Sequence, residues 1–190
     1  LIADTGPAHM TDKVLAAIKQ LTQTVAASPR VNTCSGVSCP AMPFGWTSPF
    51  MNAVISSPAP ARPLRYIFNT SMAPEHTGGN AKLAAAGYYP RGGGNAGAVA
   101  GIGNEAMVIA HENVLQRMTG AAGKTPAPEE VWPSDTYHRD FYKLSEYFNG
   151  EPVVAYHVPK AHTDGDSLVY FRHSEVISAG DVFSTVSYPV

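Results

Sequence analysis

Apolar and polar positions in the first half of the chain follow the periods of helices and strands in turn. Apolar residues recur at helical spacing from Met10 to Leu21, with Thr11 as a suitable N-cap, which predicts a first helix. A short strand is predicted over 64–68, followed by a second helix over 78–86 that Gly87 closes. This order of elements is typical of an α/β protein.

Strand patterns dominate the second half of the chain. A strand over 107–110 is joined through His111 to a helix over 112–118, and this junction favours a capping or packing role for His111. Beyond a proline-rich loop at 119–135, further strands are predicted over 142–148, 152–158, 168–171 and 176–178. Such serial strands are suited to a second sheet.

Composition indicates one ordinary domain. With 44% hydrophobic residues, 15% charged residues and a formal net charge of −2, the 190 residues are typical of a single soluble domain over 1–190. Residues 24–63 are rich in Pro, Ser and Ala, and we interpret them as a loop-rich insertion. The chain has no Lys/Arg cluster and no apolar stretch of about 20 residues, which argues against a nucleic-acid partner and against a membrane span.

The two cysteines, Cys34 and Cys39, lie close together in the segment rich in Ser, Gly and Pro. An intraloop disulfide is the simplest interpretation, and it predicts a periplasmic or secreted protein. Two free thiols in a cytosolic protein are the alternative. A zinc site at these cysteines is disfavoured, because no second Cys or His pair accompanies them.

The most informative feature is the loop that follows the strand at 64–68. Residues 68–80 read Phe-Asn-Thr-Ser-Met-Ala-Pro-Glu-His-Thr-Gly-Gly-Asn, and they are accompanied by Asp-Thr-Gly at 4–6, His-Thr-Asp-Gly-Asp-Ser at 162–167 and Gly-Asp at 180–181. In this order the blocks resemble those of the metallo-β-lactamase superfamily. Its metal-binding loop reads Asn-Thr, then His-x-His-x-Asp-His, then Thr-Gly-Gly-Asn. The chain is more similar to the general hydrolases of that superfamily than to the true β-lactamases.

The resemblance implies a fold and an extent. Members of the superfamily form a four-layered αββα sandwich, so the serial strands at 142–178 are expected in its second sheet. The superfamily places a β-hairpin before the Asp-Thr-Gly strand, and after the Gly-Asp turn it places further chain with a final metal-binding His. Neither lies in these 190 residues, so the chain is interpreted as an interior segment, incomplete at both ends.

The resemblance also assigns candidate ligands position by position. The superfamily's three-His site falls on Ser71, Ala73 and His162, of which alanine has no donor atom and a serine hydroxyl is a poor zinc ligand. The second site retains more donors, with Glu75 in place of Asp, His76 and Asp181. The candidate metal residues are therefore Glu75, His76, His162 and Asp181.

These residues allow two interpretations. They could hold one divalent metal ion, and a site rich in oxygen makes Mn²⁺, Fe²⁺ or Ca²⁺ as reasonable as Zn²⁺. They could equally form a hydrogen-bonded polar cluster that holds the loops together without metal. Asp164 and His162 are the catalytic candidates, since a carboxylate near a metal-bound water can act as general base. For Asp166 a turn-capping role is favoured.

Two functions follow. The first is a metallo-β-lactamase-fold hydrolase with a reduced, single-metal site, which cleaves an ester, lactone or amide in a small-molecule substrate. The second is a non-catalytic binding or assembly protein on the same fold, with an oligomer or assembly partner. Retained His76, His162 and Asp181 favour the first, and Ser71 and Ala73 favour the second.

Overall fold

The computed structural model describes residues 1–27, 64–87, 89, 105–120, 125–144 and 151–185. Cys34 and Cys39, and all of the expected insertion except its first four residues, lie outside the described residues. The segment 90–104, which includes a glycine-rich run, also lies outside them.

One sheet is parallel and central to the molecule. Its strands lie in the order β1-β2-β3-β4, with every neighbouring pair parallel, and they are β1 (Ile2–Ala3), β2 (Tyr66–Phe68), β3 (Met107–His111) and β4 (Asp135–Tyr137). The strand β2 is buried at every position, as a parallel strand covered on both faces should be.

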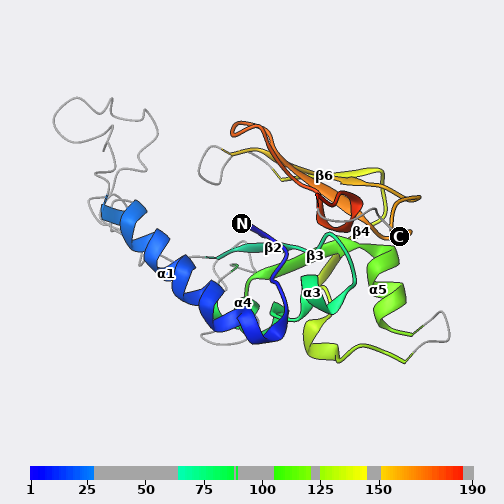
Figure 1. Cartoon of the computed structure of the whole chain (residues 1–190), viewed down its shortest axis with the longest axis horizontal. Helices are drawn as coiled ribbons and strands as arrows, with labels where there is room; N and C mark the ends of the chain where they lie inside the picture. The colour runs from blue at the N-terminus through cyan, green and yellow to red at the C-terminus, as the bar shows by residue number, and fades with distance from the viewer. Residues whose placement is uncertain (28–63, 88, 90–104, 121–124, 145–150, 186–190) are drawn as a thin grey trace, which may run out of the picture.

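The second sheet is an antiparallel meander. It follows chain order, with β5 (Phe141–Leu144), β6 (Val153–His157), β7 (Ser167–Phe171) and β8 (Val176–Ser178). In Figure 1 it forms the orange and yellow layer above the parallel sheet. The prediction of a second sheet built from serial strands is confirmed.

A hydrophobic core joins the facing sides of the two sheets. Its buried members come from both sheets and are Tyr66, Phe68, Ile109, Tyr137, Val153, Ala155 and Val169. The alternation of side chains along β6 and β7 explains the set, because every second residue of an antiparallel strand points to the same face.

Helices cover the other face of the parallel sheet. They are α1 (Thr11–Ala27), α3 (Pro74–Thr77), α4 (Asn80–Ala86) and α5 (Glu112–Met118), with short 3₁₀ turns η1 (Ala8–Met10), η2 (Glu129–Val131) and η3 (Gly180–Val182). Val14, Leu15 and Ile18 of α1 pack with Leu83 of α4 against Ile67 and Val108. None of the described helices has the length and hydrophobicity needed to span a bilayer.

The described residues thus supply three layers, helix on sheet on sheet (Figure 1). On the outer side of the antiparallel sheet, Phe141, Tyr156 and Ile177 are 46%, 43% and 59% exposed. Among these described residues, the fourth, helical layer of the expected sandwich is not seen.

The boundaries of the first two helices differ from the sequence prediction. Helix α1 continues to Ala27 instead of ending at Leu21, because the next helix breaker in the sequence is Pro29. The Thr11 hydroxyl donates to the carbonyl of Ala8, so it does not cap the helix as predicted. The helix expected at 78–86 is α4, which begins at Asn80. The separate turn α3 before it was not predicted, although Pro74 is suited to a first helical position.

A further difference is β4, which was not predicted: Asp135 is the last residue of the predicted loop, and Thr136 and Tyr137 were assigned to no element. Its three residues, Asp-Thr-Tyr, bury only Tyr137, so no apolar run marks the strand. Other boundaries were predicted correctly, namely those of α5 and β8 and the position of Gly87 as C-cap of α4.

Candidate functional site

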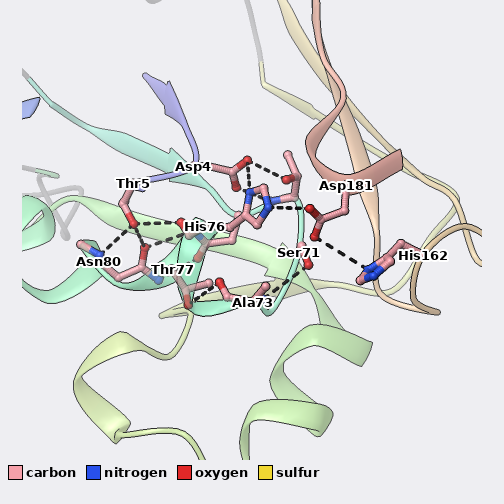
Figure 2. A network of polar contacts seen from close by, with 12 residues as sticks. Asp4, Thr5, Ser71, Ala73, His76, Thr77, Asn80, His162 and Asp181 are labelled. Atoms are coloured by element: carbon pink, nitrogen blue, oxygen red, sulfur yellow. Dashed lines mark hydrogen bonds and ion pairs between the residues drawn. The ribbon is translucent and has the colours of Figure 1, made fainter. Parts of the chain in front are cut away.

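The order of the parallel strands explains why the candidate residues meet. Carboxyl ends of parallel strands lie at the same edge of a sheet, so Asp4 after β1 and Thr70 after β2 become neighbours. The backbone N–H of Asp4 donates to the carbonyl of Phe68 at 2.7 Å. Figure 2 shows the loop before α3 and the turn η3 reaching the same edge.

Asp4 is fixed by the backbone and side chain of Thr70. One carboxylate oxygen accepts the Thr70 N–H at 2.8 Å, and the other accepts the Thr70 hydroxyl at 2.6 Å. The second oxygen also lies 2.9 Å from Nδ1 of His76. Asp4 therefore holds a proton on Nδ1 and sets the orientation of the imidazole.

His76 lies between two carboxylates. Its Nδ1 faces Asp4, and its Nε2 lies 2.9 Å from Oδ1 of Asp181 (Figure 2). The hydrogen bond to Asp4 raises the pKa of His76 to about 9, aided by the charges of both carboxylates and opposed by partial burial. His76 is therefore an imidazolium at neutral pH in the metal-free protein.

Asp181 reaches this site from the turn η3. Gly180 before it has φ +51°, and a Cβ there would lie 2.2 Å from Oγ1 of Thr70, so only glycine fits. Burial raises the pKa of Asp181, but hydrogen bonds from His76 and Ser71 and the charge of His162 outweigh it and leave that pKa below its usual value. Asp181 is an anion shared by three side chains.

His162 completes the cluster from the loop between β6 and β7. Its Nδ1 lies 3.8 Å from Oδ2 of Asp181, and its side chain is 41% exposed. The two oxygens of one carboxylate thus face two different histidines. His76, His162 and Asp181, predicted as metal residues, are brought together.

Glu75, the fourth predicted metal residue, lies exposed in the first turn of α3. It and His76 are successive residues of one helical turn, so their side chains leave the helix about 100° apart. Because His76 points at Asp181, Glu75 points elsewhere. It does not join the network in this structure.

The two aspartates after His162 have different partners. Asp166 is buried and accepts hydrogen bonds from the backbone and hydroxyl of Thr163, which confirms the turn-capping role favoured from the sequence. Asp164 is exposed, and its carboxylate accepts a hydrogen bond from Nε of Arg117, which lowers the pKa of Asp164. Asp164, the general-base candidate, is thus paired with Arg117.

The two positions without metal-binding histidines have structural roles. Ser71 is buried and its hydroxyl donates to Asp181. Ala73 is the N-cap of α3, and its carbonyl accepts the Thr77 hydroxyl at 3.1 Å. Neither supplies a strong metal donor.

The donors present meet part of the needs of a metal ion. No group of three His, Cys, Asp or Glu within the described ranges is already arranged to hold a metal. Yet the Asp4 contact keeps Nδ1 of His76 protonated, so a metal would bind Nε2 in place of the proton that Nε2 shares with Asp181. Together with Asp181 and a turned His162, this gives two nitrogens and one carboxylate, a donor set that suits Zn²⁺ or Fe²⁺.

Sequence reasoning did not identify Asp4 as a site residue, or Asn80 as its support. Both lie in quoted blocks, the Asp-Thr-Gly and the Thr-Gly-Gly-Asn, so the signal was present. Asn80 is fully buried and hydrogen-bonds to Thr5, Asn69 and the carbonyl of Val131. It joins the turn after β1 to the end of β2.

No protein-family model matches the sequence, and a search of curated proteins found no match. Among solved structures, the chain is similar to a HARLDQ-motif mutant of a metallo-β-lactamase from Cronobacter sakazakii, with a TM-score of 0.50 and 16% identity over 95% of this chain. The match covers 50% of that structure's chain.

Two further structures match less well. The HARLDQ-motif metallo-β-lactamase from the same organism gives a TM-score of 0.47 and 16% identity, over 88% of this chain and 43% of that chain. A metallo-β-lactamase family protein from Thermus thermophilus gives a TM-score of 0.40 and 19% identity, over 67% of this chain and 43% of that chain. The chain spans about half the length of the first of these three structures, and with that match the two-sheet architecture described above is the metallo-β-lactamase fold.

Proposed function

We propose that this chain is part of a metallo-β-lactamase-fold hydrolase with a reduced site, in which His76, His162 and Asp181 hold one divalent metal, Zn, Mn or Fe. The observation that carries the proposal is the contact of Asp4 with Nδ1 of His76 at 2.9 Å. A carboxylate on the outer nitrogen orients a histidine for metal binding and increases its basicity.

The positions of the other donors support the proposal. Asp181 faces both histidines at once, and His162, with its side chain 41% exposed, can turn toward Asp181 at little cost. Asp4 and Thr70 fix His76, while Gly180 allows η3 to approach closely enough to present Asp181. All three donors are partly open to solvent, so a substrate could reach them.

A bound divalent metal supplies a Lewis acid and a water of lowered pKa for attack on an ester, lactone or amide. The protein residues orient and hold protons around it. The Asp4 carboxylate keeps the imidazole proton of His76 on Nδ1, which therefore remains a hydrogen-bond donor. Asp164, held ionised by Arg117, is the carboxylate proposed to accept a proton from the attacking water.

Metal titration of chelator-stripped protein tests the proposal. At pH 7.5 we expect about one metal per chain and the release of about one proton, because the Nε2 proton of His76, whose pKa is about 9, must leave. Asp4→Asn should weaken metal affinity by about 10–100-fold, the usual effect of changing such an outer partner. Asp12→Asn, at an exposed surface pair with Lys82, is the matched control and should leave affinity unchanged.

Binding of no metal by the purified protein would exclude this function. A second candidate would then apply, a non-catalytic binding or assembly protein. It is supported by the state of His76, whose two nitrogens are both occupied by carboxylates. This candidate requires that hydrolysis of a generic ester be absent or insensitive to chelator, and the enzyme requires that chelator abolish it.

We propose in addition that Cys34 and Cys39, which lie close in sequence, form a disulfide and that the protein is therefore periplasmic or secreted. We expect no free thiol in protein purified from such a compartment without reductant. Thiol titration under denaturing conditions, before and after reduction, measures this, with two thiols per chain expected after reduction. Two free thiols before reduction would contradict it.

A further inference from the structure

A second histidine pair lies apart from the proposed metal residues. His111 ends β3 and is the N-cap of α5, where its Nδ1 accepts the backbone N–H of Asn113 at 3.3 Å. Its ring stacks on that of His157, at the end of β6, with centroids 3.5 Å apart and planes 8° from parallel. His111 is only 3% exposed.

His157 connects this stack to the loop that carries His162. Its Nε2 donates to the carbonyl of Asp164 at 2.7 Å, and Nδ2 of Asn113 donates to the same carbonyl at 2.8 Å. The carboxylate of Asp164 is held in addition by Arg117 of α5. Loop 158–166 is thus held against α5 by three contacts, namely the histidine stack, the Asn113 hydrogen bond in the first turn and the Arg117 ion pair in the last turn.

His111 is not fully satisfied in this position. Because Nδ1 accepts a hydrogen bond, the ring proton lies on Nε2, and this atom is buried without a partner, the one such side-chain atom found in the part of the chain that the structure describes. A buried donor without an acceptor destabilises the closed arrangement, since its lost hydration is not replaced. Opening the stack would let water hydrate Nε2, which offsets part of the cost of opening.

A proton on His111 cannot be accommodated while the stack is closed. Protonated Nδ1 would face the N–H of Asn113, donor against donor, and the helix cap would be lost. The new charge would also be buried at 3.5 Å from the ring of His157. The charges around His111 act in opposite directions on its protonation. Glu112 and Asp164 favour the cation, whereas His157 and His138 oppose it. The ring of Tyr137 packs edge to face against that of His111.

We propose that the stack of His111 on His157 is an acid-sensitive latch, which opens when His111 takes up a proton and releases loop 158–166 from α5. The latch requires no metal at His76, His162 and Asp181. Because the loop carries His162, opening would change the geometry of the site from a distance.

The direction of the pH effect follows from burial. Burial, and secondarily the charge of His157, lower the pKa of His111 from its ordinary value of about 6.5. The open state therefore binds more protons than the closed state below about pH 6.5. The closed latch has its full stability above that pH and loses it as the pH falls.

Hydrogen exchange of backbone amides, followed by mass spectrometry on the whole metal-free chain, tests the latch. After correction for intrinsic rates, we expect protection in 158–166 to fall about tenfold or more between pH 7.5 and pH 5.5, since tenfold corresponds to one pKa unit. Protection in β2 should not show this acid loss, because the raised pKa of His76 stabilises the fold toward lower pH. In His111→Asn the acid loss should disappear, because asparagine caps a helix and does not titrate.

His173→Gln is the matched control. His173 is exposed in the turn between β7 and β8, so the variant removes one titrating histidine without touching the stack, and the acid loss should persist. Constant protection of 158–166 in the wild type would overturn the latch, as would an equal loss in His111→Asn. If His111→Asn does not fold, NMR titration of the His111 ring decides, since its midpoint must coincide with that of the loop exchange.

Discussion

Replacing Asp4 by Ala is expected to lower the free energy of unfolding of the metal-free protein by about 3–5 kcal/mol near pH 7, the usual cost of removing one partner of a buried ion pair. The Asp4 side chain is 15% exposed, and it accepts hydrogen bonds from Thr70 and His76. Its loss leaves the Thr70 groups without their acceptor and the imidazolium of His76 with one carboxylate. Denaturant unfolding in the presence of chelator measures the change.

A surface ion pair supplies the control for this prediction. Asp12 pairs with Lys82, but the two side chains are 78% and 59% exposed. Such pairs contribute about 0–1 kcal/mol, so Asp12→Ala should have a small effect. Equal effects of Asp4→Ala and Asp12→Ala would show that the site does not have the buried network described here.

Asp4→Ala should also alter how the free energy of unfolding depends on pH. The folded-state pKa of His76 is about 9, above the ordinary value of about 6.5, so the folded protein binds more protons than the unfolded chain between these values. The stabilisation is complete below about pH 6.5 and is lost as the pH rises through 9, a change of about 3 kcal/mol at 1.36 kcal/mol per pKa unit. Asp4→Ala should flatten this profile, and a wild-type profile that is already flat would contradict the assignment.

Local patterns predicted those parts of the fold that depend on neighbours in sequence. The helix over 112–118 and the strand over 176–178 match the structure, because periodicity and turns act over a few residues. The strand at 135–137 was missed, since its position is set by pairing with Ile109 and its neighbours on β3 rather than by its own residues. The architecture came from the resemblance of four motif blocks, and the structural match agrees with it.

The candidate site shows the same division between local and distant effects. The resemblance of the motif blocks predicted His76, His162 and Asp181 as site residues, and the fold brings these three side chains together. The resemblance could not show that Glu75 leaves α3 in another direction, because that depends on where the helix begins. The stack of His111 on His157 joins residues of two different sheets, so no local pattern could have indicated it.

Asn80 should be the second most sensitive position, although no role in catalysis is assigned to it. Its amide donates to Asn69 and to the carbonyl of Val131, at 2.8 and 2.7 Å, and its Oδ1 accepts from Thr5 and Asn69 at 3.1 Å each. Asn80→Ala leaves these buried groups unpaired, and each such group costs about 1–3 kcal/mol. We expect a loss of about 4 kcal/mol in the free energy of unfolding, near the upper end for single substitutions.

A double-mutant cycle with Asn69 separates this network from simple loss of packing. Asn69 is 1% exposed and exchanges two hydrogen bonds with Asn80, so removal of either side chain leaves the other buried and partly unpaired. The double variant Asn69→Ala, Asn80→Ala should therefore cost less than the sum of the single variants, by about 0.5–3 kcal/mol. Additive losses would mean that the two amides act independently. A double variant that costs less than the sum would show that the two amides act as one hydrogen-bond network. Through Thr5 this network holds the turn after β1, which presents Asp4 to His76, and it contacts no metal and no substrate.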